Sequence, residues 1–177
     1  MNKIKNLYDK KGFTLIEIIT SIVVLSILGT IVGMGFVSAI HGYFIAKGNT
    51  DTVQNAEIIL ARLAKEINST GSITSGNQTS LTFLSKSTNP VDQPLILSWD
   101  SPSKILSLGQ DTLANNVFSF SLNYFDKFDA TASPTYSPAS TAIIKITLGL
   151  IGADNVISTF EERVFLYNLM TGLMTGI

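Results

Sequence analysis

Residues able to do acid–base, nucleophilic or metal chemistry are few in this chain. It contains no cysteine, and its one histidine, His41, directly follows a long apolar run. A Ser-His-Asp triad would have to use His41, and no serine lies in a Gly-x-Ser-x-Gly turn. No glycine-rich phosphate loop follows a strand pattern. We therefore expect a protein that is not an enzyme, with no catalytic residue and no cofactor.

Acidic residues offer two further candidates. Glu161 and Glu162 are adjacent, so in a strand they would point to opposite faces and make a poor acid–base pair. Asp126 and Asp129 lie in a segment rich in serine, threonine and proline. Their carboxylates are of the type that calcium prefers. The simpler interpretation is that both are solvated loop acids, so no metal site is predicted.

A further acid, Glu17, lies alone in an apolar run. It is the one charged residue in the 28 residues from Phe13 to Ile40, which contain no proline. About 20 such residues cross a bilayer as a helix, which satisfies its own backbone hydrogen bonds. A carboxylate in hydrocarbon is destabilising unless it is paired or reaches the headgroups. Both interpretations of Glu17 are open on this ground alone.

Positive charge is concentrated before this run. Four lysines precede it and one follows shortly after it: Lys3, Lys5, Lys10, Lys11 and Lys47. The positive-inside rule therefore places residues 1–12 in the cytoplasm and the rest of the chain outside. The run is too long for an ordinary secretory signal, and no small-x-small cleavage site ends it. We expect a single-pass membrane anchor.

The residues around Gly12 resemble a known processing site. Lys-Gly-Phe-Thr-Leu-Ile-Glu, with a basic leader before it and a long apolar helix after it, is similar to the prepilin site of bacterial type IV pilins and type II secretion pseudopilins. The resemblance implies cleavage after Gly12 by prepilin peptidase and N-methylation of Phe13. It also implies that Glu17 pairs with the new amine of a neighbouring subunit and sets the register between subunits.

The resemblance also implies partners and a location. Lys10 and Lys11 supply the charge of the cleaved leader. The partners would be the peptidase, an inner-membrane assembly platform, other pilin or pseudopilin subunits and, before assembly, membrane lipid. The chain would start in the inner membrane with its N-terminus in the cytoplasm, and would end in a periplasmic or cell-surface filament.

The helix is expected to continue beyond the membrane. Apolar residues recur every three or four positions between Thr52 and Ile67, at Val53, Ala56, Leu60, Leu63 and Ile67. This stripe is predicted to pack on a sheet. A kink is expected at Gly48 and Asn49, and the Ser/Thr/Gly-rich stretch from Asn68 to Asn77 should end the helix. Within the span, Gly29 and Gly33 have the spacing of close helix contacts, although ordinary membrane-helix glycines remain the alternative.

The remainder reads as β-structure. Alternating or short apolar runs predict strands at residues 81–84, 95–99, 104–108, 118–124 and 144–150, and a last strand including residues 163–169. Residues 126–142 are predicted to be an exposed loop. The fold class is therefore α+β, a long N-terminal helix packed on an antiparallel β-sheet head. The expected parts are a leader (1–12), a membrane helix (13–40), an amphipathic continuation (41–68) and the head (69–177).

Charge narrows the function further. Removing the four lysines and one aspartate of residues 1–12 leaves 8 basic and 12 acidic residues, a net charge of −4. An acidic body argues against a broad nucleic-acid-binding face. The order of strands resembles J-type minor pseudopilins and related minor pilins, and the chain lacks the C-terminal cysteine pair of many major pilins. We expect a non-catalytic minor or priming subunit; the alternatives are an adhesive or DNA-binding tip pilin, the major repeating pilin, or a membrane-anchored enzyme.

Overall fold

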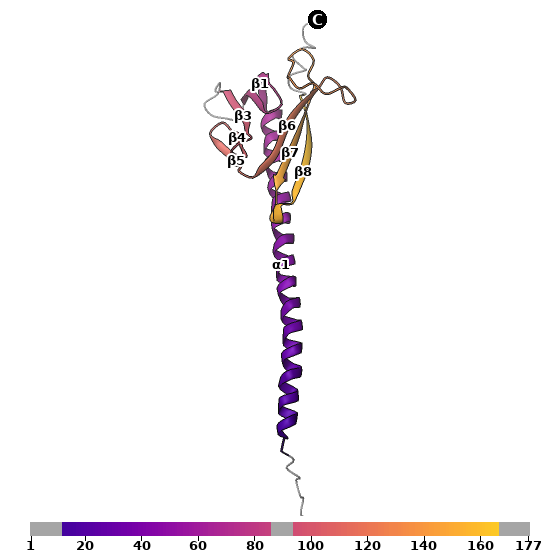
Figure 1. Cartoon of the computed structure of the whole chain (residues 1–177). Coiled ribbons are helices and arrows are strands. Elements are labelled where there is room, and N and C mark those ends of the chain that lie inside the picture. Colours follow the sequence, from indigo (N-terminus) through magenta and orange to yellow (C-terminus); the bar gives the residue numbers. More distant parts are fainter. Residues whose placement is uncertain (1–11, 86–93, 167–177) are drawn as a thin grey trace, which may run out of the picture. The chain divides into compact units, whose positions relative to one another are not determined.

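The computed structural model describes residues 12–85 and 94–166 of the chain (Figure 1). One helix, α1 (Leu15–Asn68), is followed by eight strands and a short 3-10 turn. The chain divides between Phe44 and Ile45 into two compact units. The α+β class predicted from the sequence is confirmed.

The first unit contains the apolar part of α1. Every side chain from Gly12 to Phe44 is exposed in the chain by itself. Four hydroxyl-bearing residues of this segment donate to the backbone carbonyl four residues earlier: Thr20, Ser21, Ser26 and Thr30. These four hydroxyls are therefore satisfied within the helix, as a low-dielectric surrounding requires.

In the second unit, α1 buries one stripe of side chains. The buried residues are Thr52, Ala56, Ile59, Leu60, Leu63 and Ile67. The predicted stripe was right except for Val53, which is 37% exposed because it lies at the margin of this helical face. The predicted kink at Gly48 and Asn49 was wrong, since α1 continues through both residues.

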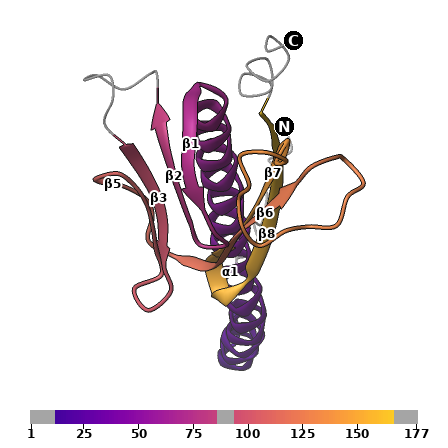
Figure 2. The same cartoon turned by 90° about the horizontal axis from the view of Figure 1, so that it is seen from above.

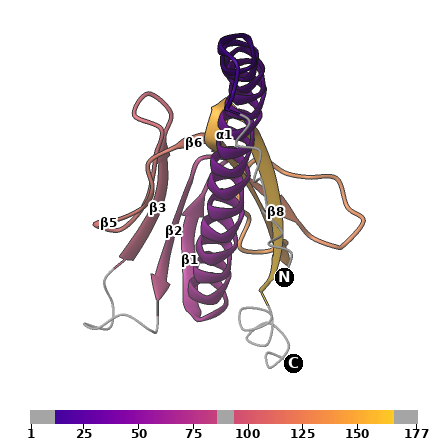
Figure 3. The same cartoon turned by 90° about the horizontal axis from the view of Figure 1, so that it is seen from below.

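The strands form two antiparallel sheets. In the first, strands β1 to β5 pair in sequence order: β1 (Thr70–Gly76), β2 (Ser80–Ser85), β3 (Pro94–Asp100), β4 (Ile105–Leu108) and β5 (Asp111–Ala114). In the second, β6 (Val117–Phe125), β7 (Ile143–Ile151) and β8 (Ile157–Phe165) also pair in sequence order. Figure 2 and Figure 3 show the two sheets on different sides of the C-terminal part of α1.

Strands with clear apolar alternation were predicted, and those without it were missed. The stretch from Asn68 to Asn77 was expected only to end the helix, yet it contains β1, which pairs with β2 and buries Thr70 and Ile73. The strand β5 was also missed. The predicted last strand is present as β8, which pairs residue by residue with β7 from Ile157 to Phe165. The prediction was wrong at Leu166, which follows the strand, and residues 167–169 of the prediction lie outside the described residues.

Strand β6 departs from strict alternation at its start. Phe118 was predicted to share the buried face with Phe120 and Leu122, but it is 52% exposed. The pairing of β6 with β7 shifts register between Val117 and Ser119, so Val117 takes the buried position. An extra residue in one strand reverses which side chains face the core.

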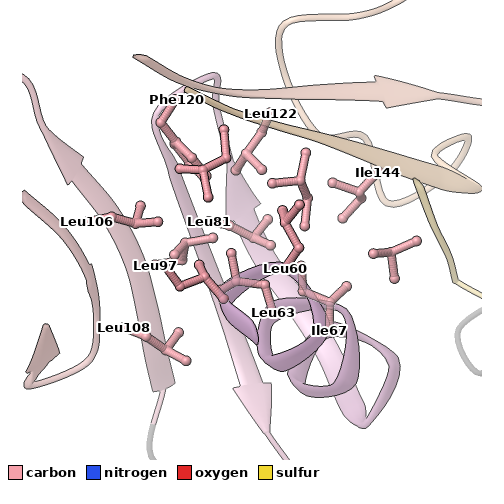
Figure 4. Close-up of a cluster of buried hydrophobic side chains, with 14 of the residues drawn as sticks. Leu60, Leu63, Ile67, Leu81, Leu97, Leu106, Leu108, Phe120, Leu122 and Ile144 are labelled. Carbon is pink, nitrogen blue, oxygen red and sulfur yellow. The ribbon is translucent and has the colours of Figure 1, made fainter. Parts of the chain in front are cut away.

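The helix and both sheets share one hydrophobic core (Figure 4). Leu63 and Ile67 of α1 are 0% and 1% exposed. Around them lie Leu81, Leu97, Leu106 and Leu108 of the first sheet and Phe120, Leu122 and Ile144 of the second. A shared core explains why residues after Ile45 form one unit although the strands belong to two sheets.

The connection from β6 to β7, drawn in orange in Figure 2, is held by backbone hydrogen bonds to β6 and to the end of β1. The backbone amides of Tyr124 and Ser133 each donate to the other residue's carbonyl, at N···O distances of 3.0 and 2.8 Å. The amide of Tyr136 donates to the carbonyl of Gly76 at 3.0 Å, and Thr141 is buried. The predicted loop is therefore present, but part of it is anchored rather than free.

Candidate functional site

The residues of the predicted processing site lie at the start of the described chain. Gly12 and Phe13 precede α1 and belong to no helix or strand, and the Phe13 side chain is 79% exposed. Lys10 and Lys11 lie outside the described residues. The peptide bond between Gly12 and Phe13 is thus presented ahead of the helix, without covering side chains from the described part of the chain.

Thr14 caps the helix that follows. Its backbone carbonyl accepts from the amides of Glu17 and Ile18 at 3.1 and 3.2 Å, and its hydroxyl oxygen accepts from the Glu17 amide at 3.3 Å. Thr14 and Glu17 thus occupy the N-cap and third helical positions of the Ser/Thr-x-x-Glu capping pattern. This role of Thr14 was not part of the sequence prediction, although the spacing of the two residues would have indicated it.

Glu17 lies in the first turn of α1. The unsatisfied amides of a helix N-terminus carry partial positive charge, which favours a carboxylate there. A free amine on Phe13 would add a full positive charge one residue before the cap. Such an amine is unfavourable beside the positive end of the helix unless a carboxylate lies nearby, and Glu17 is the one acid between Phe13 and Ile40.

Beyond Glu17, large apolar side chains project from α1 without any covering group in the described chain. At least 48% of each is exposed in Ile18, Ile19, Ile22, Val23, Val24, Leu25, Ile27, Leu28, Ile31 and Val32, among others. Within the described residues, α1 is the one helix long and apolar enough to cross a membrane. So much exposed apolar surface requires lipid or other protein chains around it.

Glycines in this part of the chain have no packing role within it. A Cβ atom added to Gly12, Gly29, Gly33 or Gly35 would meet no other described atom within 4 Å, leaving out chain neighbours and the adjacent helix backbone. If glycine is required at these positions, the requirement must come from another molecule. At Gly12 that molecule would be one that must approach the backbone closely.

The other candidates for chemistry are dispersed. His41 is exposed on α1, and Asp126 and Asp129 are exposed in the β6–β7 connection. The Lys145 amine donates to Glu161 at 2.7 Å, and this hydrogen bond holds the pKa of the Glu161 carboxyl below its usual value. The described residues contain no group of three or more His, Cys, Asp or Glu side chains that could hold a metal ion.

Comparison with known proteins identifies one matching family model. Residues 8–33 match the prokaryotic N-terminal methylation motif. No curated protein and no solved structure matches the chain. The motif, the long helix and the antiparallel sheets are consistent with the type IV pilin and pseudopilin family. The motif implies processing by prepilin peptidase and assembly with other pilin subunits, and it indicates a structural, membrane-anchored subunit.

Proposed function

We propose that the chain is a non-catalytic prepilin that is cleaved between Gly12 and Phe13, methylated on the new Phe13 amine and assembled through α1 into a type IV pilus or a type II secretion pseudopilus. Before cleavage, residues 13–40 would hold it in the inner membrane, with residues 1–12 in the cytoplasm and the head outside. Lys10 and Lys11 would be removed with the leader.

One observation carries this proposal. A methylation motif leads directly into a helix whose apolar side chains are all exposed up to Phe44, while the head buries its own core. A segment of this kind suits lipid first and the inside of a helical polymer later, because both surroundings cover apolar side chains. The same segment need not refold between the two states.

Glu17 would fix the position of each subunit when α1 moves from lipid into the polymer. In lipid, its carboxylate lies one helical turn from the start of α1, within reach of the headgroups. In the polymer, the methylated amine of a neighbouring Phe13 would pair with it, and the pair would fix the axial position of one subunit against the next. Apolar contacts alone specify such a register weakly, since sliding one apolar helix along another changes little buried area.

The chain is further proposed to be a minor or priming subunit rather than the major one. It lacks the C-terminal cysteine pair of many major pilins. Its head also contains two sheets, of five and three strands. The abundance of the protein relative to other subunits in purified filaments would test this point.

Mass spectrometry of the N-terminus of the mature protein tests the central claim. The expected terminus is a methylated Phe13, with residues 1–12 absent. A replacement of Gly12 by a bulky residue (Gly12→Leu) should leave the leader attached. A mature protein that still begins at Met1 would contradict the proposal.

Replacing Glu17 tests the assembly step separately. Glu17→Ala should insert into the membrane and be cleaved normally but be incorporated into filaments poorly. The matched control is Glu57→Ala, an exposed acid on the second unit's part of α1, which should be incorporated at the wild-type level. Equal incorporation of the wild type and Glu17→Ala would remove the proposed role of Glu17.

A further inference from the structure

We propose that the β6–β7 connection forms a binding site for a neutral saccharide. The site is a hollow of about 380 Å³, here called the loop hollow, between the end of β6 and residues 130–141. Its volume lies near the lower end of the range of small-molecule sites, about 300–1,000 Å³. The inference concerns the head alone and does not depend on the processing of the N-terminus.

The walls of the loop hollow are held in place by the fold. The Tyr124–Ser133 backbone pair fixes one side, and the Ser137 amide donates to the Thr141 hydroxyl oxygen at 3.0 Å on the other. The Tyr136 ring lies edge-on to the Tyr124 ring, with 6.0 Å between centroids. Tyr124 in turn donates its hydroxyl to the Asn77 carbonyl at 2.8 Å. A site that is already formed loses less entropy when a ligand binds.

Two prolines stiffen the same segment. Pro134 and Pro138 fix their own φ angles and restrict the residue before each of them. The connection between β6 and β7 is long for two antiparallel neighbours, and such long ordered connections commonly serve binding. The strands need no such connection for their own pairing, because a short hairpin would join them.

The lining is dominated by hydroxyl groups. Side-chain hydroxyls come from Thr131, Ser133, Thr135, Ser137, Ser140 and Thr141. Each serine or threonine hydroxyl offers one donor and two acceptor positions. The chain's own hydrogen bonds use few of these. The Ser133 hydroxyl donates to the Thr135 carbonyl and accepts from the Thr135 amide, and the Thr141 hydroxyl accepts from the Ser137 amide. The loop hollow therefore has hydrogen-bonding capacity that the chain itself leaves for a ligand or solvent.

One carboxylate completes the lining. Asp126 supplies it, from an exposed position directly after β6. An ionised carboxylate accepts strong hydrogen bonds from hydroxyl donors, and two neighbouring hydroxyls of a sugar can reach its two oxygens together. A ligand with many hydroxyls meets both the hydroxyl groups and the carboxylate.

The charge of the lining excludes other ligand classes. No lysine, arginine or histidine is among the residues that line the loop hollow. Phosphates, sulfates and acidic sugars carry negative charge and would meet the Asp126 carboxylate without a cation in the lining to compensate it, since the nearby Arg163 guanidinium lies over the Phe125 and Phe128 rings. An apolar ligand would leave the hydroxyls unsatisfied. A neutral saccharide is the class that avoids both penalties.

Saturation-transfer NMR on the full-length chain in lipid nanodiscs tests the proposal. Nanodiscs avoid the sugar headgroups of glycosidic detergents. The probes are glucose, galactose, mannose and N-acetylglucosamine, each at millimolar concentration. At least one of the four should receive saturation from the wild-type protein.

Two variants separate the loop hollow from the rest of the head. Asp126→Asn should weaken binding about tenfold, because it replaces charge-assisted hydrogen bonds by neutral ones. The matched control is Asp129→Asn, which removes the same charge three residues further along at a position that does not line the hollow, and it should bind as the wild type does. Ser140→Ala should also weaken binding, and Ser101→Ala, at an exposed turn, should not.

Three results would overturn the proposal. These are the absence of saturation transfer to all four sugars, equal effects of Asp126→Asn and Asp129→Asn, and stronger transfer to an acidic sugar than to its neutral counterpart. Near-UV circular dichroism verifies that each variant is folded. Because N-terminal processing is measured independently, loss of sugar binding with a normal methylated Phe13 would reject this site and leave the proposed function standing.

Discussion

Two parts of α1 differ in what surrounds their side chains. Between Leu15 and Phe44, apolar residues such as Leu25 and Ile31 are 66% and 64% exposed. Between Thr52 and Ile67, six residues of the same helix are buried against the sheets. The apolar side chains after Thr52 stabilise the chain's own fold. Those before Phe44 are left uncovered by the described part of the chain, and lipid or another protein would have to cover them.

The glycines divide in the same way. Gly29, Gly33, Gly35 and Gly42 have open space where a side chain would lie. A Cβ atom on Gly48 would lie 2.7 Å from the Cβ of Ala153, and one on Gly152 would lie 2.7 Å from the side-chain oxygen of Asn49. Glycine is thus a packing requirement of the fold after Ile45. Before Phe44 it affects the fold only through helix propensity.

The largest expected difference between the two parts comes from removing apolar side chains. Leu63→Ala should lower the free energy of unfolding by about 2–5 kcal/mol, because Leu63 lies in the core and its truncation leaves a cavity. Ile27→Ala, at a residue that is 57% exposed, should leave the stability of the head unchanged. Urea unfolding in mild detergent, followed by the fluorescence of Trp99, measures both.

That measurement reports on the head because Trp99 lies in β3 and packs against the core. Incorporation into filaments gives the complementary measurement. Ile27→Ala should lower incorporation although its head is as stable as that of the wild type. Equal loss of head stability in the two variants would show that the two parts of α1 do not differ as described.

A smaller difference is expected between two glycines six residues apart on α1. Gly48→Ala forces Ala153 to move, and overpacking of this kind costs about 1–3 kcal/mol. Alanine also gains up to about 1 kcal/mol in helix propensity over glycine. Because the overpacking cost is the larger of the two, the substitution should destabilise the head. Gly42→Ala meets no described atom within 4 Å and should be neutral or stabilising. The midpoint temperature of thermal unfolding should therefore fall in Gly48→Ala and stay the same or rise in Gly42→Ala.

In that comparison each variant is the control for the other, since both replace a helical glycine by alanine. Stabilisation by Gly48→Ala would mean that Ala153 of the β7–β8 turn is not in close contact with the helix at Gly48. The contact between the turn and α1 would then be looser than the structure describes.

The smallest expected effect is a pH dependence confined to the head. The hydrogen bond from Lys145 lowers the pKa of Glu161 in the folded chain. The unfolded chain therefore binds this proton more readily, so the pair stabilises the fold above the ordinary glutamate pKa and loses that contribution as pH falls through the lower folded pKa. Glu161 is 56% exposed, so the contribution should stay within about 1 kcal/mol.

The comparison of Glu161→Gln with the wild type measures this contribution. The two proteins should differ in stability near neutral pH and converge in acid, and high salt should reduce the difference. Glu162→Gln, one residue further along β8, is the matched control and should not reproduce the salt-sensitive difference. A constant difference between wild type and Glu161→Gln at all pH values would contradict the ion-pair explanation.

Local patterns carried most of the successful predictions. The apolar run and the three-to-four spacing after Thr52 predicted α1, and alternation predicted β6 and β7. The strands β1 and β5 lack such a pattern, since β1 is rich in serine, threonine and glycine. They form because neighbouring strands supply hydrogen-bond partners, which a strand's own composition does not reveal. The exposure of Phe118 was likewise missed because a register shift is a property of two strands together.

The candidate site was accessible to sequence reasoning for a different reason. Gly12, Phe13 and Glu17 lie within six residues, and the apolar run follows at once, so chain order alone brings them together. The Thr14 cap also depends on short spacing. By contrast, the loop hollow joins β6 to residues as far along as Thr141. No spacing rule connects those positions before the loop has folded back.

The sequence by itself determined the membrane-length helix, its single acid, the processing motif and the β character of the head, because each depends on residues that are neighbours along the chain. Only the tertiary structure decided that the strands divide into two sheets, that Arg62 pairs with Asp111 across 49 positions at 2.6 Å, and that Gly48 lies under the β7–β8 turn. Those contacts depend on where the backbone returns in space. That path is set by the burial of the shared core as a whole and not by any short segment.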